Sequence, residues 1–522
     1  MSAIDVLGQR VIDRLGLPKD AWEIAAQLEV EGMRDSDART YGLRDLFELA
    51  RAIERRFRAG AYTFFVEGED PRPRVIPIVR FLRRYFAGIV FAVPMALQAA
   101  SMLVWGYGIW GAIHLELTQG SAIALGFIAS YIVAGGFAQA IVRRGLFYMY
   151  QEEETLARWT ALRGFGIALR AMLALLAVIL LANLVFEILP WSMALVAALY
   201  YVGLGTLWLS WSLLYLVRRM EMLVVVTVAA LGAVLLAAKV FAASPIVANA
   251  VGVAMADALS FAIAWFLLAR LAKKRKHEPV NPPRMAVLIF STSRYFVYGL
   301  LFNAFLFADR VIAWTTRIGR DDFPPYAFWL SVRYELAMDL ALVVAIVMGG
   351  MVEYAIERFS DKLVPHQKRV RSSEAAGFID DQRAAHRRRS WQIVASAAAG
   401  LATAWALFFA LQRIPDAQFH AAITATATLR VFAVASVAYV FFMFAVRNLL
   451  LLLTLSRVDA AVRCLGTALS VDVVTGFVFS RAIGYWAAVL GLAAGAIVLM
   501  IASNRALRRT LDRLDYFYYA AY

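Results

Sequence analysis

Long apolar segments recur along the chain, separated by short charged stretches. A helix needs about 20 apolar residues to cross a hydrocarbon core about 30 Å thick, and twelve segments reach or approach that length. Six precede the basic run from Lys273 to Lys276 and six follow it. The pattern predicts an all-α polytopic membrane protein with about twelve transmembrane helices, at residues 85–112, 119–142, 162–188, 190–217, 222–243, 245–271, 286–315, 325–353, 390–412, 422–455, 458–479 and 481–502.

The two sets of six also have matching loops. In each set, the stretch between the second and third helices is charged and helical in pattern, at residues 143–162 and 354–389. Two halves of this kind indicate a parallel repeat about an axis along the membrane normal, with a substrate path between the halves. We therefore expect a first six-helix lobe at 81–272, a second at 285–505 and a cytoplasmic tail at 506–522.

The first 80 residues lack a membrane segment and read as a small helical cytoplasmic region with a linker. Asp20 can cap a helix from Ala21 to about Glu31. The Pro-rich stretch at 67–77 breaks any regular element. This region either packs on the membrane face of its own protein or docks a cytoplasmic partner. Its second helical stretch has apolar residues at helical spacing, namely Leu46, Phe47, Ala50, Ile53 and Phe57.

Composition supports the membrane assignment. A mean hydropathy of +0.65 and 62% hydrophobic residues exclude an ordinary soluble globule. The formal charge of +15 could indicate a nucleic-acid partner, but Lys and Arg concentrate in alternate loops. This positive-inside asymmetry places both termini in the cytoplasm. The basic excess then reflects topology and contact with anionic lipid headgroups, and we expect no nucleic acid.

Few motifs point to a cofactor, metal or catalytic group. One cysteine, Cys464, excludes an internal disulfide and a thiolate metal site. The five histidines lack metal-ligand spacing. Residues 106–111 match G-x-G-x-x-G, but they lie in a membrane segment without the βαβ unit that dinucleotide binding needs, and no Walker A sequence is present. Gly491 and Gly495 form a GxxxG motif that permits close helix approach.

Charged residues inside the membrane segments are more informative. Each costs a few kcal/mol or more unless it faces a cavity or a partner. Glu335 and Asp339 are four apart, so they share a helix face about 6 Å from each other. Two carboxylates this close in a low dielectric do not both ionise easily, and the pair could bind a cation, take up a proton or hold an arginine such as Arg333. Two plainer interpretations remain: interhelical ion pairs, and contact of Asp309 and Arg310 with headgroups.

The stretch from Tyr295 to Arg310 resembles a segment of the Pel exopolysaccharide exporters (PelG type). In that family a Gly-Leu-Leu-Tyr-Asn run leads to Trp-x-Asp-Lys and then to an aromatic-Trp pair. Here Phe302 stands for the Tyr, Phe307 for the Trp and Arg310 for the Lys, and Trp314 follows. The next stretch is similar as well, with Tyr334-Glu335-Leu336 in place of Tyr-Asp-Leu and Gly349-Gly350-Met351 in place of Pro-Gly-Met.

The resemblance implies the two-lobed fold of the multidrug/oligosaccharidyl-lipid/polysaccharide (MOP) flippase superfamily. It implies a non-enzymatic exporter or flippase of a polysaccharide or lipid-linked saccharide, in the bacterial inner membrane, that works by alternating access. A cytoplasmic glycosyltransferase or synthase complex could bind through residues 1–80. The candidates for the substrate or ion path are Asp257, Asn303, Asp309, Arg310, Arg333, Glu335, Asp339, Arg447 and Asp472.

Two other functions stay open. A multidrug or other small-molecule exporter of the same fold would have a similar sequence pattern. A membrane glycosyltransferase or acyltransferase is the second alternative. Such enzymes need a histidine inside the membrane or acidic residues in sizeable outer loops, whereas the histidines here fall in loops or at segment edges and the outer loops are short.

Overall fold

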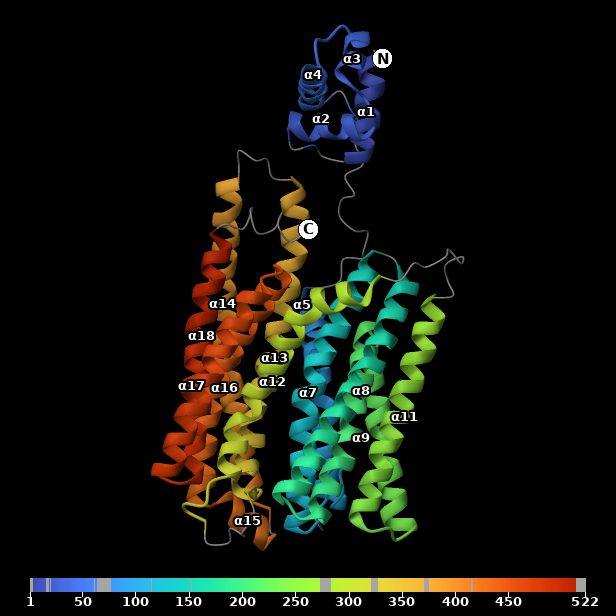
Figure 1. Ribbon diagram of the computed structural model, residues 1–522. Coiled ribbons are helices and arrows are strands. Elements are labelled where there is room, and N and C mark those ends of the chain that lie inside the picture. Colours follow the sequence, from blue (N-terminus) through green and yellow to red (C-terminus); the bar gives the residue numbers. More distant parts are fainter. Residues whose placement is uncertain are drawn as a thin grey trace. The chain divides into compact units, whose positions relative to one another are not determined.

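The computed structural model describes residues 3–15, 18, 20–60, 62, 77–113, 115–151, 153–272, 283–320, 327–369, 375–414 and 416–512 (Figure 1). Within these ranges the chain is helical and has no β-strand, apart from one isolated bridge between Tyr107 and Ala112. The expected all-α fold is confirmed. The chain divides into two compact units, and each is described by itself.

The first unit comprises Met1–Arg84, Glu353–Gln392 and Arg509–Tyr522. Asp20 accepts a hydrogen bond from the Glu23 amide at 3.0 Å and so caps the second helix, as the sequence predicts. Asp45 caps the fourth helix in the same way. The helices bury one shared apolar core. The N-terminal elements are α1 (Ala3–Leu15), α2 (Ala21–Val30), α3 (Asp35–Ala38), η1 (Arg39–Tyr41) and α4 (Leu46–Arg58).

The second unit, Tyr85–Val352 and Ile393–Arg508, holds the apolar helices. Several helices continue beyond it, because charged residues that favour helix follow the apolar ones. The elements are α5 (Pro77–Ile89), η2 (Val90–Ala92), α6 (Val93–Trp105), α7 (Leu117–Tyr150), α8 (Glu154–Phe186), α9 (Trp191–Leu216), α10 (Glu221–Leu235), η3 (Leu236–Val240), α11 (Pro245–Ala272), α12 (Met285–Trp314), α13 (Val332–Arg369), α14 (Ala375–Leu411), α15 (Ala417–Ile423), α16 (Thr426–Thr454), α17 (Val458–Ala482), η5 (Tyr485–Ala488) and α18 (Val489–Leu511).

Eleven helices in the described ranges are long and apolar enough to cross a membrane. The first expected segment, 85–112, is not one of them. Pro94 lacks an amide proton, so the bond to the carbonyl one turn earlier is missing and the chain tightens into η2 before α6. Helix α6 is apolar but short, and it ends at Trp105 because Gly106 turns the chain with φ +80°.

Helices α6 to α11 pack against one another, and α12, α16, α17 and η5 form a second packed group. The two groups meet along α7 and α12. Glycines bring these two backbones close together there. A Cβ on Gly299 would lie 2.5 Å from the Gly135 carbonyl oxygen, and one on Gly135 would overlap the Asn303 amide. We call this contact between α7 and α12 the glycine seam.

Candidate substrate-path site

A network of charged side chains joins α12 to α13. The Arg310 guanidinium on α12 donates to Glu335 Oε2 at 2.5 Å and to Asp339 Oδ1 at 3.1 Å through both Nη1 and Nη2. The Trp314 indole, one turn beyond Arg310, donates to Glu335 Oε1 at 2.8 Å. The spacing of four between Glu335 and Asp339 puts both carboxylates on the α13 face that meets Arg310. We call Arg310, Glu335 and Asp339 the charged trio.

The three members of the trio differ in exposure. The Arg310 side chain is 9% exposed and that of Glu335 17%, whereas the Asp339 side chain is 66% exposed. Arg310 is therefore buried beneath the two carboxylates that accept its hydrogen bonds, whereas the Asp339 carboxylate is exposed. With two acids and one base, the trio has a net negative charge when all three members are ionised. It offers hydrogen-bond acceptors to a passing ligand.

A second polar contact lies deeper in the same lobe. Asp309, next to Arg310 in sequence, accepts a hydrogen bond from the Tyr334 hydroxyl at 2.6 Å and is fully buried. Asp472 on α17 is also fully buried and interacts electrostatically with Asp309. Neither oxygen of Asp472 has a hydrogen-bond partner among the described residues. Burying an unpaired carboxylate is expensive.

Helix α18 closes over Asp472. A Cβ on Gly491 would lie 2.4 Å from the Asp472 carbonyl oxygen and 2.7 Å from its Oδ1, and one on Gly495 would lie 2.9 Å from the Asp472 Cβ. The Gly491-x-x-x-Gly495 spacing therefore serves close helix packing, as the sequence predicts. A larger side chain at either glycine would push α18 away from α17.

The remaining predicted residues lie apart from the trio. Asp257 on α11, in the first lobe, accepts from the Thr206 hydroxyl at 2.5 Å. Asn303 is buried against Gly135 at the glycine seam. Arg447 on α16 is buried, and Arg333 at the start of α13 is exposed. The structure thus brings together Asp309 and Arg310 of α12 with Glu335 and Asp339 of α13, and Asp472 lies beside Asp309.

Two details of the sequence interpretation are wrong. Arg310, rather than Arg333, is the cation between Glu335 and Asp339. Asp309 and Arg310 are buried at 0% and 8% exposure and bond to α13, so the alternative that they reach the headgroups does not hold.

Sequence reasoning also missed the neutral donors Trp314, Tyr334 and Thr206, and it missed Tyr439 on α16, which lies beside Arg310. Trp314 and Tyr334 lie in the stretches that resemble the PelG-type exporters. The resemblance could therefore have pointed to them as site residues. No comparable sequence signal marked Thr206 or Tyr439. Among the described residues, no cluster of three or more His, Cys, Asp or Glu side chains is arranged to hold a metal ion.

Helices long and apolar enough to span a membrane, with charged side chains buried between them, are typical of membrane transporters. The chain belongs to the PelG family, described as putative exopolysaccharide exporters (EPS-E), whose sequence pattern matches residues 80–519. The matched region covers all the membrane helices and leaves the N-terminal helices α1 to α4 outside it.

Solved transporter structures share the fold. A MATE P26A mutant has a TM-score of 0.58 at 14% identity, covering 85% of this chain and 98% of that one. An inward-facing multidrug resistance MATE transporter of the MOP superfamily has a TM-score of 0.55 at 13% identity, covering 82% and 99%.

A MOP superfamily transporter from Pyrococcus furiosus Vc1, described by a reverse polarity of its binding pocket, has a TM-score of 0.56 at 12% identity. It covers 83% of this chain and 96% of that one. At such identities the likeness concerns the fold. No curated protein sequence matches the chain at a significant level.

Proposed function

We propose that this exporter moves a polysaccharide or lipid-linked saccharide across the bacterial inner membrane by alternating access of its two lobes. The charged trio faces the saccharide in this proposal. The observation that carries it is the exposed Asp339 carboxylate, held in place by a buried Arg310 that also binds Glu335. Family membership supports the saccharide as the cargo.

The geometry also favours one kind of contact with the cargo. Arg310 already donates to both carboxylates, so it is poorly placed to bind an acidic sugar group as well. The carboxylate of Asp339 can accept hydrogen bonds from sugar hydroxyls. Such contacts are weak enough singly to be broken as the chain moves on, which conduction requires. We therefore assign sugar hydroxyls as the partners of Asp339.

The proposal has three finer features. The Lys and Arg asymmetry supports cytoplasmic N- and C-termini. The exporter family and fold support a non-enzymatic role. The folded α1–α4 region, outside the matched family region, supports docking of a cytoplasmic glycosyltransferase or synthase complex. Under this proposal the N-terminal region recruits the machinery that makes the saccharide.

The experiment compares Asp339→Asn and Glu335→Gln for protein abundance in the membrane and for saccharide export. Because Asp339 is exposed, we expect Asp339→Asn to keep normal abundance. We expect its export to fall about tenfold or more, since a hydrogen bond to a charged group contributes about 1.5–3 kcal/mol. Glu335→Gln should reduce both abundance and export, because Glu335 is held by Arg310 and Trp314.

Glu153→Gln, at an exposed position before α8, is the matched control and should change neither quantity. Normal abundance with normal export in both single variants and in the double variant would remove the trio from the transport path. Loss of small-molecule efflux with unchanged saccharide export would instead favour the multidrug alternative.

A further inference from the structure

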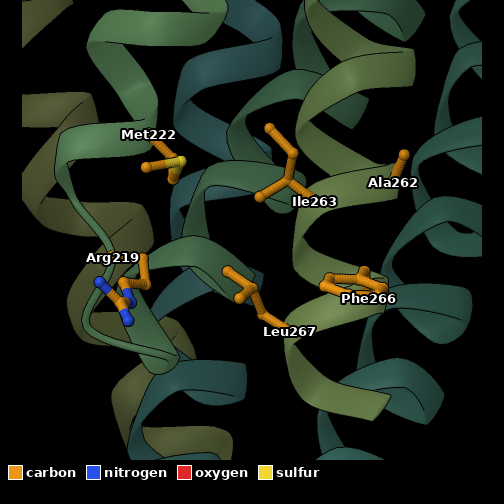
Figure 2. Close-up of a pocket in the computed structure, with 6 residues that line it drawn as sticks. All are labelled: Arg219, Met222, Ala262, Ile263, Phe266 and Leu267. Atoms are coloured by element: carbon orange, nitrogen blue, oxygen red, sulfur yellow. The ribbon is translucent and has the colours of Figure 1, made fainter. Parts of the chain in front are cut away.

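A groove opens between the start of α10 and the second half of α11, far in sequence from the charged trio. Figure 2 shows its lining residues. Its volume is about 340 Å³. Five of the residues that line it are apolar and one is basic: Met222, Ala262, Ile263, Phe266, Leu267 and Arg219.

The groove begins at a helix end and runs into the membrane. Arg219 lies in the turn between α9 and α10, across the groove from Leu267 near the end of α11, which ends at Ala272. At a rise of about 1.5 Å per residue, Leu267 lies roughly 7 Å and Ala262 roughly 15 Å inward from Ala272. The groove therefore reaches about halfway through a hydrocarbon core of about 30 Å, which is the depth of one lipid leaflet.

The lining is open to lipid rather than sealed by protein. Phe266 on α11 is 62% exposed, and Val225, one turn beyond Met222 on α10, is 51% exposed. An apolar groove of this depth, open sideways, fits one acyl chain.

One basic side chain, Arg219, lies at the mouth of the groove. Arg219 is 58% exposed, and its Nη1 contacts Glu221 Oε1 at 3.1 Å. Such an exposed pair contributes little, so Glu221 does not compete strongly with a second acceptor. Arg218 lies in the same turn, but its Nη2 donates to the Tyr150 hydroxyl at 2.9 Å. The excess of positive charge favours an anionic headgroup.

We propose that this groove binds one anionic phospholipid, with an acyl chain along α11 and the phosphate on Arg219. A guanidinium matches phosphate geometry with two parallel hydrogen bonds. The bound lipid bridges α10 and α11 of the first lobe at the membrane surface. The site does not depend on the saccharide path, because no residue of the charged trio lines it.

The test uses full-length protein in a mild detergent and native mass spectrometry, with phosphatidylglycerol and phosphatidylcholine titrated separately. We expect about a fivefold preference for phosphatidylglycerol in the parent protein, as one basic residue near the surface supplies. Arg219→Gln should reduce the preference to about one. Arg284→Gln removes an exposed arginine at the start of α12 and should leave the preference unchanged.

A second variant tests the apolar part of the groove without changing charge. Ala262 is exposed, so Ala262→Trp fills the groove at little cost to folding, which thermal unfolding of the purified protein checks. We expect it to lower retention of both phospholipids. Equal retention of the two lipids by the parent protein would overturn the proposal, and so would an unchanged preference in Arg219→Gln. A copurified lipid-linked saccharide in the groove would also overturn it.

Discussion

The two lobes both pack apolar and aromatic side chains, but they differ in the charged residues that they bury. The first lobe packs apolar and aromatic side chains, with Trp208 in contact with Trp110, Phe127 and Trp211. Among the described residues, every charged residue that is buried belongs to the second lobe. These residues are Asp309, Arg310, Arg447 and Asp472.

The difference indicates that the two lobes have different roles. A buried charge is retained against its cost only where it is paired or used. The first lobe is held mainly by non-directional packing of apolar and aromatic side chains. The second lobe adds the directional hydrogen bonds of its charged side chains. Three substitutions test this contrast, from the largest expected effect to the smallest.

The strongest test removes the cation from the charged trio. Arg310→Gln leaves Glu335 and Asp339 facing each other without a positive partner, and breaking a buried pair in this way costs about 3–5 kcal/mol. We expect a large loss of membrane abundance and a lower thermal unfolding temperature. Arg310→Lys should restore part of both, because a lysine keeps the charge but not the paired contacts with Asp339. Unchanged stability in Arg310→Gln would show that the trio is not a structural unit.

A smaller effect is expected at the buried aspartates. Tyr334→Phe removes the hydroxyl that donates to Asp309, and an unsatisfied buried acceptor costs about 1–3 kcal/mol. The measurement is the unfolding temperature of the purified protein. Tyr131→Phe is the control in the first lobe, since the Tyr131 ring packs on Trp208 and Phe307 and should lose little with its hydroxyl. Equal losses in the two variants would contradict the contrast between the lobes.

The smallest effect is expected at the polar contact of the first lobe. Asp257→Asn keeps an oxygen that accepts from Thr206, and Thr206 also lies within bonding distance of the Val202 and Gly203 carbonyls. We expect a change of about 1 kcal/mol or less in stability and normal export. If export stopped while abundance stayed normal, Asp257 of the first lobe would be required for transport. The proposed difference between the two lobes would then be wrong.

The sequence predicted the helices better than their ends. Apolar length alone does not show where a helix ends, because charged residues such as Glu357 and Arg358 extend it as readily as apolar ones do. The charged stretch at 354–389 was nevertheless predicted to be helical, and α13 continues to Arg369. The break before α6 follows from Pro94, which a count of apolar residues overlooks.

The candidate site was predictable only within one helix. The spacing of Glu335 and Asp339 follows from helical periodicity, whereas the choice of Arg310 over Arg333 depends on how α12 crosses α13. Consecutive residues on a helix point about 100° apart. For that reason Asp309 and Arg310 serve different partners, and their adjacency in sequence gave no indication of this.

The glycine seam has a consequence for the energetics of opening. At Gly135 and Gly299 the lobes meet backbone to backbone, but aromatic rings pack across the same two helices, Phe307 on Phe127 and Tyr131, and Phe296 on Phe137. Hydrophobic cost scales with the apolar area exposed, at about 25 cal/mol per Å², so separating α7 from α12 would cost most at these rings and least at the glycines. A single methyl group added at Gly299 would act as a wedge that holds them apart.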